Sequence, residues 1–276
     1  MIANVLSIAG VDPSGGAGVL ADIKTFSALG VYGAGVVTAL TAQNTRAVTG
    51  VHAVPPEFIA QQIDTLFADV RIDAVKIGML GTAAIVEVVA SRLRAHGVTQ
   101  LVIDPVMIAK SGDRLLSPDA VAALREMLVP LARVLTPNLP EAAVLLDAVE
   151  PSTQAEMGGM ARALLQLGAR IVVLKGGHLA GAESADLVDD GVRQITITAP
   201  RIATRNTHGT GCTLSAAIAA LLPRYADPFE AIRAAKQFLT AAIAHSGDLD
   251  VGQGHGPVHH FHALWSPDPR SSRFTG

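Results

Sequence analysis

The feature that most constrains the fold is a regular alternation of two kinds of segment along almost the whole chain. Apolar runs of strand length, rich in β-branched residues, are followed by longer segments in which apolar residues recur with helical periodicity. The strand-like runs are "NVLSIAG", "GVVTALTAQN", "DAVKIGM", "QLVIDPVM", "ARVLTPN" and "RIVVLKGG". Because runs of this kind are typical of strands buried on both faces, the sequence predicts an α/β protein with a three-layer fold, in which helices cover both faces of a mostly parallel central sheet.

Local patterns add detail to this prediction. In the first predicted helix, "GAGVLADIKTFSALG", we expect one buried face to carry Leu20, Ile23, Phe26 and Leu29. The segment around Gly191 departs from the alternation, and its short strands predict a hairpin at a sheet edge. We expect a single domain over residues 1–265, followed by a flexible tail, "SPDPRSSRFTG", over residues 266–276.

Composition narrows the class of protein. Half of the residues are hydrophobic but only 4% are aromatic, so a large core must be built mainly from Ala, Val, Leu and Ile. A formal net charge of −3 gives no broad basic surface for nucleic acid. The single cysteine excludes an intrachain disulfide and a multi-cysteine metal site. Because the first residues already resemble a strand and charged residues interrupt every apolar helix, we expect a cytoplasmic protein without a membrane span.

Polar and glycine-rich segments follow most of the predicted strands. In sheets of this kind, ligands bind where the carboxyl ends of the strands meet, so these segments are expected to converge on one cleft. They comprise Gly10 to Gly18, Gln43 and Asn44, Gly78 and Met79, Asp104 to Met107, Pro137 to Glu141, Lys175 to Gly177, and the turn before Cys212.

Two glycine-rich turns could bind an anion. The segment "GVDPSGGAG", from Gly10 to Gly18, does not have the spacing of a dinucleotide-binding fingerprint; it is either a tight turn that presents backbone amides to a small ligand or a turn without a ligand. No Gly-Lys dipeptide occurs, so a Walker A loop is absent. In "HGTGC", Gly209 and Gly211 could bring several N–H groups to the start of a helix and form an anion hole, although a plain glycine-capped turn has the same sequence pattern.

Several polar side chains are candidates for the chemistry, each with a structural alternative. Asn138 and Glu141 in "NLPE" could both face the cleft, or could form a capping box. Asp104 ends a buried strand and needs a partner, for which Mg²⁺ is a good candidate. Lys175, which ends another strand, must either snorkel to solvent or meet an anion. Gln43 could read the edge of a heterocycle or simply be solvated.

A histidine-rich segment lies near the end of the chain. The run "GHGPVHHFHALW" contains His255, His259, His260 and His262. It lacks the cysteine or carboxylate partners of a usual metal site, so packing anchored by Trp265 is favoured over metal binding.

Taken together, these motifs resemble the ribokinase-like superfamily of small-molecule kinases, first through "GTGC" before a helix and "NLPE" as an N-x-x-E motif. Within that superfamily, the chain resembles the bacterial hydroxymethylpyrimidine/phosphomethylpyrimidine kinase family of thiamine biosynthesis. The matching segments are "AGVDPSGGAGVLADIKTFSALGVYG", "TALTAQNT", "DAVKIGML", "VIDPVMIAKSGDRLLS", "LTPNLPEAAVLL", "VVLKGGHL", "NTHGTGCTLSAAIAA" and "GHGPVHHFHALW". The resemblance extends from about residue 4 to residue 265.

The resemblance implies ATP and Mg²⁺ as cofactors, a small pyrimidine as substrate and a homodimeric assembly. The implied substrate-binding residues are Gln43, Asp22, Gly10, Met79 and Val106. The implied catalytic residues are Cys212, Gly209, Thr210, Gly211 and Lys175. For the nucleotide the resemblance implies Asn138, Lys175 and Thr207, and for the metal Glu141 and Asp104.

Cys212 occupies the place where most ribokinase-like enzymes carry an aspartate base. A helix N-terminus can lower the pKa of a thiol, so we expect a thiolate that accepts the proton of the substrate hydroxyl. For transfer to a monophosphate, a thiol that stays neutral would avoid repelling the substrate. The main alternative is a pyridoxal kinase of the same superfamily. A non-catalytic nucleotide or vitamin sensor and a dinucleotide-dependent oxidoreductase fit the motifs less well.

Overall fold

The computed structural model describes residues 1–108, 115–177, 179 and 181–265. The segment predicted to be a flexible tail, residues 266–276, therefore lies outside the described residues.

The strands of the described residues form one mostly parallel, nine-stranded sheet in the order β3-β2-β1-β4-β5-β6-β7-β8-β9. Strands β2, β1, β4, β5, β6 and β7 are parallel, whereas β3 at one edge and β8 near the other pair antiparallel with their neighbours. Their bounds are β1 Asn4–Val11, β2 Tyr32–Gln43, β3 Val48–Ala53, β4 Ala74–Ile77, β5 Leu101–Ile103, β6 Val134–Leu135, β7 Val172–Lys175, β8 Glu183–Asp189 and β9 Gln194–Pro200.

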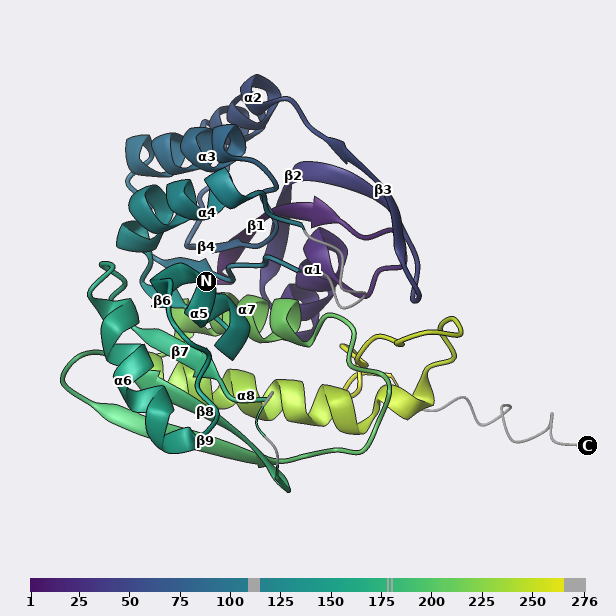
Figure 1. The fold of residues 1–276 in the computed structure, drawn as a ribbon. Helices are drawn as coiled ribbons and strands as arrows, with labels where there is room; N and C mark the ends of the chain where they lie inside the picture. Colours follow the sequence, from purple (N-terminus) through teal and green to yellow (C-terminus); the bar gives the residue numbers. More distant parts are fainter. Residues whose placement is uncertain (109–114, 178, 180, 266–276) are drawn as a thin grey trace, which may run out of the picture.

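Helices cover both faces of this sheet, which confirms the predicted three-layer α/β fold (Figure 1). One face packs against α1 (Gly18–Ala28), α7 (Thr210–Leu221) and α8 (Pro228–Ala244). The other face packs against α2 (Pro56–Phe67), α3 (Ala83–Ala95), α4 (Pro118–Ala123), α5 (Leu139–Leu146) and α6 (Gln154–Leu165). Short turns of other helical types span Leu124–Leu128, Val129–Leu131, Leu222–Arg224 and Ser246–Asp248.

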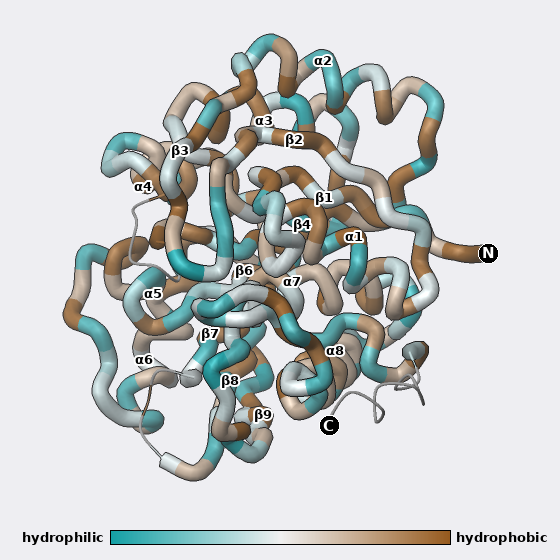
Figure 2. Tube along the Cα trace, turned by 90° about the vertical axis from the view of Figure 1, so that its right-hand side faces the viewer, coloured by the Kyte–Doolittle hydropathy of each residue, from teal (hydrophilic) through white to brown (hydrophobic). Residues whose placement is uncertain are grey.

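The core consists of two apolar layers separated by the sheet. Because successive strand residues point to opposite faces, Val5 and Val102 join the layer with α1, α7 and α8, while their neighbours Leu6 and Ile103 join the other. Helix α7 is buried along its whole length from Thr213 to Leu221. Its small side chains let it lie close to the sheet with α1 and α8 beside it, so its N-terminus is fixed near the strand ends (Figure 2).

Two local predictions were incomplete. Phe26 is fully buried and Ile23 and Leu29 pack against the core as predicted, but Leu20 is 39% exposed. The buried face also carries Val19 and Asp22, the latter because a charged partner on the sheet neutralises it. Strand β3 was missed altogether: nearly every residue in it is exposed, so it shows no apolar pattern. The predicted edge hairpin is confirmed as β8 and β9, which flank Gly191.

Within the described parts of the chain, no helix combines the length and the hydropathy needed to cross a membrane.

Candidate active site

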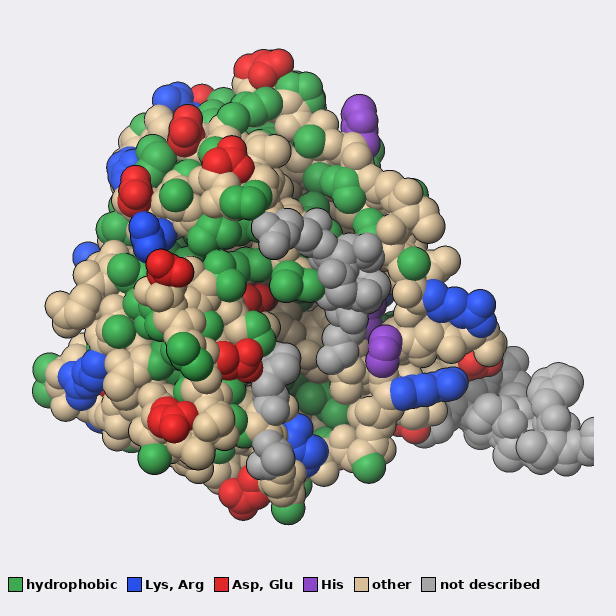
Figure 3. All heavy atoms as spheres, in the orientation of Figure 1, with side chains coloured by type: hydrophobic (Ala, Val, Ile, Leu, Met, Phe, Trp, Pro, Cys, Tyr) green, Lys and Arg blue, Asp and Glu red, His purple; other side chains and the backbone are tan. Residues whose placement is uncertain are grey.

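A cavity of about 460 Å³ lies at the carboxyl ends of the parallel strands, in front of the N-terminus of α7. The space-filling view shows the molecule hollowed near the centre of this face (Figure 3). Of the residues predicted for the site, all except Asp22 line this cavity: Gly10, Gln43, Met79, Asp104, Val106, Asn138, Glu141, Lys175, Thr207, Gly209, Thr210, Gly211 and Cys212. The strand ends therefore bring together residues that are far apart in the sequence, as predicted.

The turn before α7 exposes backbone amides to the cavity. Gly209 is the N-cap and has a φ of 75°, a conformation that favours glycine, and a Cβ at this position would collide with the carbonyl of Gly16. No side chain caps the helix, and within the described residues no acceptor is bonded to the amides of Gly211 and Cys212. Because these N–H groups also lie at the positive end of the helix dipole, the turn can bind an anion.

Lys175, Asp104 and Glu141 form a charged cluster beside this turn. The Lys175 Nζ lies 2.8 Å from Asp104 Oδ1 and 3.8 Å from Glu141 Oε2. Burial alone would lower the pKa of Lys175, but the two carboxylates raise it above its usual value, so the ammonium stays charged. The partner that Asp104 was predicted to need is thus Lys175, together with the hydroxyls of Thr136 and Ser215.

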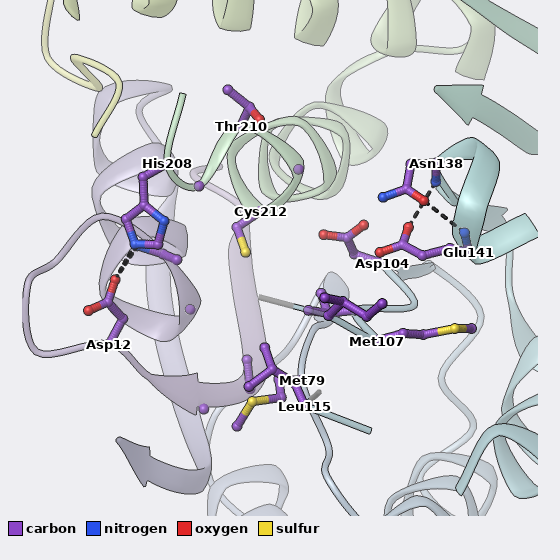
Figure 4. A pocket seen from close by; sticks show the side chains of 18 of the residues that line it. Asp12, Met79, Asp104, Met107, Leu115, Asn138, Glu141, His208, Thr210 and Cys212 are labelled. Carbon is purple, nitrogen blue, oxygen red and sulfur yellow. Dashed lines mark hydrogen bonds and ion pairs between the residues drawn. The ribbon is translucent and has the colours of Figure 1, made fainter. Parts of the chain in front are cut away.

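Asn138 and Glu141 form a capping box at the start of α5. The backbone N–H of Asn138 donates to Glu141 Oε2 at 2.8 Å, and the backbone N–H of Glu141 donates to the side-chain Oδ1 of Asn138 at 2.8 Å. Burial raises the pKa of Glu141 to about 7, while nearby Lys175 opposes this rise. The structural alternative is therefore realised, but it still leaves the Glu141 side chain in the cavity wall (Figure 4).

The donor set at this end of the cavity fits a divalent cation bound together with phosphates. Mg²⁺ in such sites is bound through one or two carboxylates plus the phosphates of a substrate, and Asp104 and Glu141 provide two carboxylates on one wall. The Lys175 ammonium lies beside both of them. No group of three or more His, Cys, Asp or Glu side chains in the described residues could hold a metal ion by itself.

The opposite end of the cavity is less polar. Gln43, at the end of β2, lies with its Oε1 3.1 Å from the Thr41 hydroxyl, which restrains the amide. Gly10 faces Met79, and a Cβ on Gly10 would lie only 2.6 Å from the Met79 Cε. This end can therefore hold a flat ring between a methionine and the backbone of β1, with one amide available for hydrogen bonds.

Asp22, on α1, lies behind the cavity wall rather than in it. Its carboxylate is fully buried and bonds to Lys76, which itself lines the cavity. The structure therefore places Asp22 out of direct reach of a ligand, unlike the other predicted substrate-binding residues.

Asp12 and His208 are site residues that the sequence motifs did not reveal. His208 Nε2 lies 2.6 Å from Asp12 Oδ2, and both side chains line the cavity (Figure 4). Asp12 also accepts hydrogen bonds from the amides of Ser14 and Ala17, so it holds the first glycine-rich turn and ties it to the turn before α7. The two residues are 196 positions apart, and nothing in their spacing could have paired them.

Comparison with known proteins identifies the family. A model of the family described as phosphomethylpyrimidine kinase matches residues 12–259. The chain belongs to this family. Hydroxymethylpyrimidine/phosphomethylpyrimidine kinase of Salmonella typhimurium is 56% identical over 262 residues, which cover 95% of this chain and 98% of the relative.

Solved structures agree with this family and with the ribokinase-like fold. An ADP complex of Bacillus subtilis pyridoxal kinase superposes with a TM-score of 0.89 at 38% identity, covering 96% of this chain and 100% of the other. Phosphomethylpyrimidine kinase of Clostridium difficile superposes with a TM-score of 0.78 at 40% identity, covering 87% and 99%.

The thiol of Cys212 differs from what its position at a helix N-terminus predicted. Its sulfur points into the cavity, but burial raises the pKa of Cys212 to about 11 (Figure 4). The expectation of a thiolate with a lowered pKa is therefore wrong, because the loss of hydration raises the pKa of Cys212 more than nearby Lys76 lowers it. The cysteine of this family member is a neutral thiol at pH 7.

The histidine-rich segment packs against the body of the protein. The His260 Nε2 lies 3.1 Å from the Thr213 hydroxyl, and the His259 ring lies against Trp265. The predicted packing is confirmed by the buried residues Val258, His259 and His260. Trp265 stacks on Phe261 but is 56% exposed, so the prediction that it anchors the segment is wrong. The backbone N–H of His208 donates to the carbonyl of Gly256, so the histidine-rich segment is hydrogen-bonded to the turn before α7.

We expect Asp12→Asn to destabilise the protein at pH 7 by about 1–3 kcal/mol, because a buried charged acceptor with several donors is lost. Burial opposes ionisation, but the bonds from His208 and Ser14 lower the pKa of Asp12 below its usual value. The stabilisation is therefore fully present above a pH of about 4 and is lost as the pH falls through the folded-state pKa. Urea unfolding at pH 7 and at lower pH measures the difference in unfolding free energy between the wild type and Asp12→Asn. A difference that grows as the pH falls would contradict the prediction.

Proposed function

We propose that the protein is an ATP-dependent kinase that phosphorylates 4-amino-5-hydroxymethyl-2-methylpyrimidine and then phosphorylates the monophosphate to the diphosphate for thiamine biosynthesis. The observation that carries this proposal is a single cavity with a ring-sized apolar end near Gln43 and a phosphate end at the turn before α7. The curated relative from Salmonella typhimurium carries the name of this activity, at 56% identity over nearly its full length.

Each part of the cavity has a role in this proposal. The amides of the Gly209–Gly211 turn and the Lys175 ammonium stabilise the charge that develops on the transferred phosphoryl group. Gln43 and Met79 orient the pyrimidine so that its hydroxymethyl group faces Cys212. Asp104 and Glu141 would hold Mg²⁺, which would supply further charge neutralisation.

Product analysis tests the proposal directly. The purified protein is incubated with hydroxymethylpyrimidine, ATP and Mg²⁺, and the products are separated by anion-exchange chromatography. We expect the monophosphate to appear first and the diphosphate to follow, with no product when EDTA is present. If neither product forms in the presence of ATP and Mg²⁺, the assignment is overturned.

Pyridoxal is the second candidate substrate, favoured by the similarity to Bacillus subtilis pyridoxal kinase. It also carries a hydroxymethyl group on a six-membered aromatic ring. Parallel measurement of kcat/KM for hydroxymethylpyrimidine, its monophosphate and pyridoxal decides between them. A sensor without catalysis is disfavoured because the turn, Lys175 and both carboxylates are present in the cavity.

We expect Glu141→Gln to raise the Mg²⁺ concentration needed for half-maximal activity about 10–100-fold, because one of two carboxylates loses its charge. The chain offers a matched control in Glu156, which forms the same kind of capping box with Thr153 at the start of α6, away from the cavity. Glu156→Gln should leave the Mg²⁺ dependence unchanged. Equal effects of the two variants would show that only the cap matters.

A homodimer is part of the same proposal. The edge hairpin of β2 and β3 exposes Tyr32, Leu40 and Val51, each more than half exposed, which is unusual for a free sheet edge. Light scattering after size exclusion should give twice the chain mass of 28.5 kDa.

A further inference from the structure

A buried ion pair beneath the cavity has no part in the functions assigned above. The Lys76 Nζ on β4 lies 3.0 and 2.8 Å from the two carboxylate oxygens of Asp22 on α1, and both side chains have no exposed surface. The Ser7 hydroxyl donates to Asp22 Oδ2 at 2.6 Å. Because removing two charges from water offsets most of the attraction between them, such a pair contributes little net stability. Its presence therefore calls for another explanation.

The position of the pair connects it to Cys212. Lys76 and Cys212 line the same cavity, and α7, which begins just before Cys212, packs on both β4 and α1. An ammonium has three protons, of which the two oxygens of Asp22 accept two. Within the described residues Lys76 Nζ bonds to no other acceptor. Gly78 keeps the space beside the ammonium open, since a Cβ there would lie 2.9 Å from Lys76 Nζ.

Four charged side chains on the elements around Cys212 influence the charge of its thiol: Lys76, Asp22, Asp104 and Lys175. Lys175 is bonded to Asp104, so these two charges largely offset each other. Burial raises the pKa of the Cys212 thiol, and Lys76 is the strongest influence that lowers it. Lys76 is therefore the cation best placed to stabilise a negative charge on the sulfur.

We propose that Lys76 is a positioning residue for the proton of Cys212: held by Asp22, whose carboxylate is in turn held by Ser7, its ammonium stabilises the thiolate that forms when Cys212 loses its proton. Asp22 shares the ammonium, so most molecules carry the neutral thiol at pH 7; in the minor thiolate form, whose proton has passed to solvent, the sulfur accepts the proton of the substrate hydroxyl. The inference rests on the proposed function, because it gives Cys212 the role of base in transfer to the alcohol.

The opposite signs of two substitutions test this coupling. Lys76→Met removes the cation and leaves Asp22, so thiolate formation should become harder. Asp22→Asn frees the whole ammonium for the sulfur, so thiolate formation should become easier. A change of one pKa unit alters the thiolate fraction about tenfold, and we expect at least this size in each direction. Lys76→Arg, which keeps a cation, should stay closest to the wild-type protein.

The reaction of Cys212 with iodoacetamide is the measurement. Cys212 is the only cysteine in the chain, so digestion of the nucleotide-free and metal-free protein and quantification of the alkylated Cys212 peptide by mass spectrometry report this thiol. The rate of alkylation is recorded from pH 7 to pH 11. The chain also provides a matched control, because Lys236 forms a second buried pair with Asp186 at 2.7 Å and also bonds the Ser184 hydroxyl, away from the cavity. Lys236→Met should leave the alkylation profile unchanged.

The outcomes separate this proposal from a purely structural role. Slower alkylation in Lys76→Met and faster alkylation in Asp22→Asn at the same pH would support it. Faster alkylation in both variants, as expected if loss of the pair merely loosens the site, would overturn it, as would unchanged profiles. If Lys76→Met does not fold, faster alkylation in Asp22→Asn together with a wild-type profile in Lys76→Arg supports the proposal, and slower or unchanged alkylation in Asp22→Asn overturns it.

A kinetic readout distinguishes this proposal from the function itself. The alkaline shift that Lys76→Met causes in the alkylation profile should recur in the pH profile of kcat for transfer to the alcohol. It should be absent for transfer to the monophosphate, because that step needs no base. Opposite shifts in alkylation without any pyrimidine kinase activity would refute the proposed function while leaving the Lys76–Cys212 coupling intact. Kinase activity with unchanged alkylation profiles would refute the coupling alone.

Discussion

Replacing Cys212 by aspartate should slow phosphoryl transfer to the monophosphate about a thousandfold more than transfer to the alcohol. A monophosphate placed for attack would bring its negative charge close to residue 212. Two unit charges about 4 Å apart repel each other by roughly 4 kcal/mol at an effective dielectric constant of about 20. Since each 1.36 kcal/mol or so changes a rate tenfold, this repulsion corresponds to about a thousandfold. The neutral thiol of the wild-type protein avoids it, because burial raises the pKa of Cys212 to about 11.

The two half-reactions are measured separately for wild type, Cys212→Asp and Cys212→Ser. Serine is the control, since it removes the thiol but stays neutral, and it should keep the wild-type ratio of the two rates even if both fall. If Cys212→Asp forms diphosphate from monophosphate at the wild-type ratio, the explanation for a cysteine at this position is wrong.

Lys175→Met should lower kcat about a thousandfold for both half-reactions, with a smaller effect on KM for the pyrimidine. The ammonium is preorganised by Asp104 and Glu141 beside the turn that binds phosphate, and loss of one such preorganised donor has an effect of about this size. Because the group acts on the transferred phosphoryl rather than on the acceptor, both steps should fall together. Steady-state kinetics with each acceptor checks this.

A second measurement on Lys175→Met does not depend on turnover. Without the ammonium, Asp104 and Glu141 face the cavity unpaired, so a divalent cation should take its place. The melting temperature of this variant should therefore rise with added Mg²⁺ more than that of the wild type, and Lys236→Met should respond as the wild type does. A variant that loses activity in only one half-reaction, or gains nothing from Mg²⁺, would contradict this role.

The layout of the cavity followed from the sequence to a large extent. Parallel strands that are covered on both faces must be apolar, so the polar segments at their ends are conspicuous, and their carboxyl ends necessarily meet at one edge. This is why the sequence alone could assign Gln43, Asp104, Lys175 and Gly209 to one cleft. The sequence did not predict strand β3, because the strand is exposed and carries no apolar pattern.

Features that depend on charges meeting across the fold could not be predicted. The Asp12–His208 pair joins residues 196 positions apart, and Asp22 points inward because Lys76 on another element neutralises it.

At Cys212 the sequence determines the position of the side chain, whereas the tertiary structure decides its protonation. The amino-acid sequence places the only thiol at a helix N-terminus beside a glycine turn, and that position predicts a lowered pKa. The protonation of the thiol depends instead on tertiary packing, because the hydration that a thiolate loses is set by how α7 lies against the sheet. That loss raises the pKa of Cys212 more than Lys76 lowers it, so the thiol stays neutral.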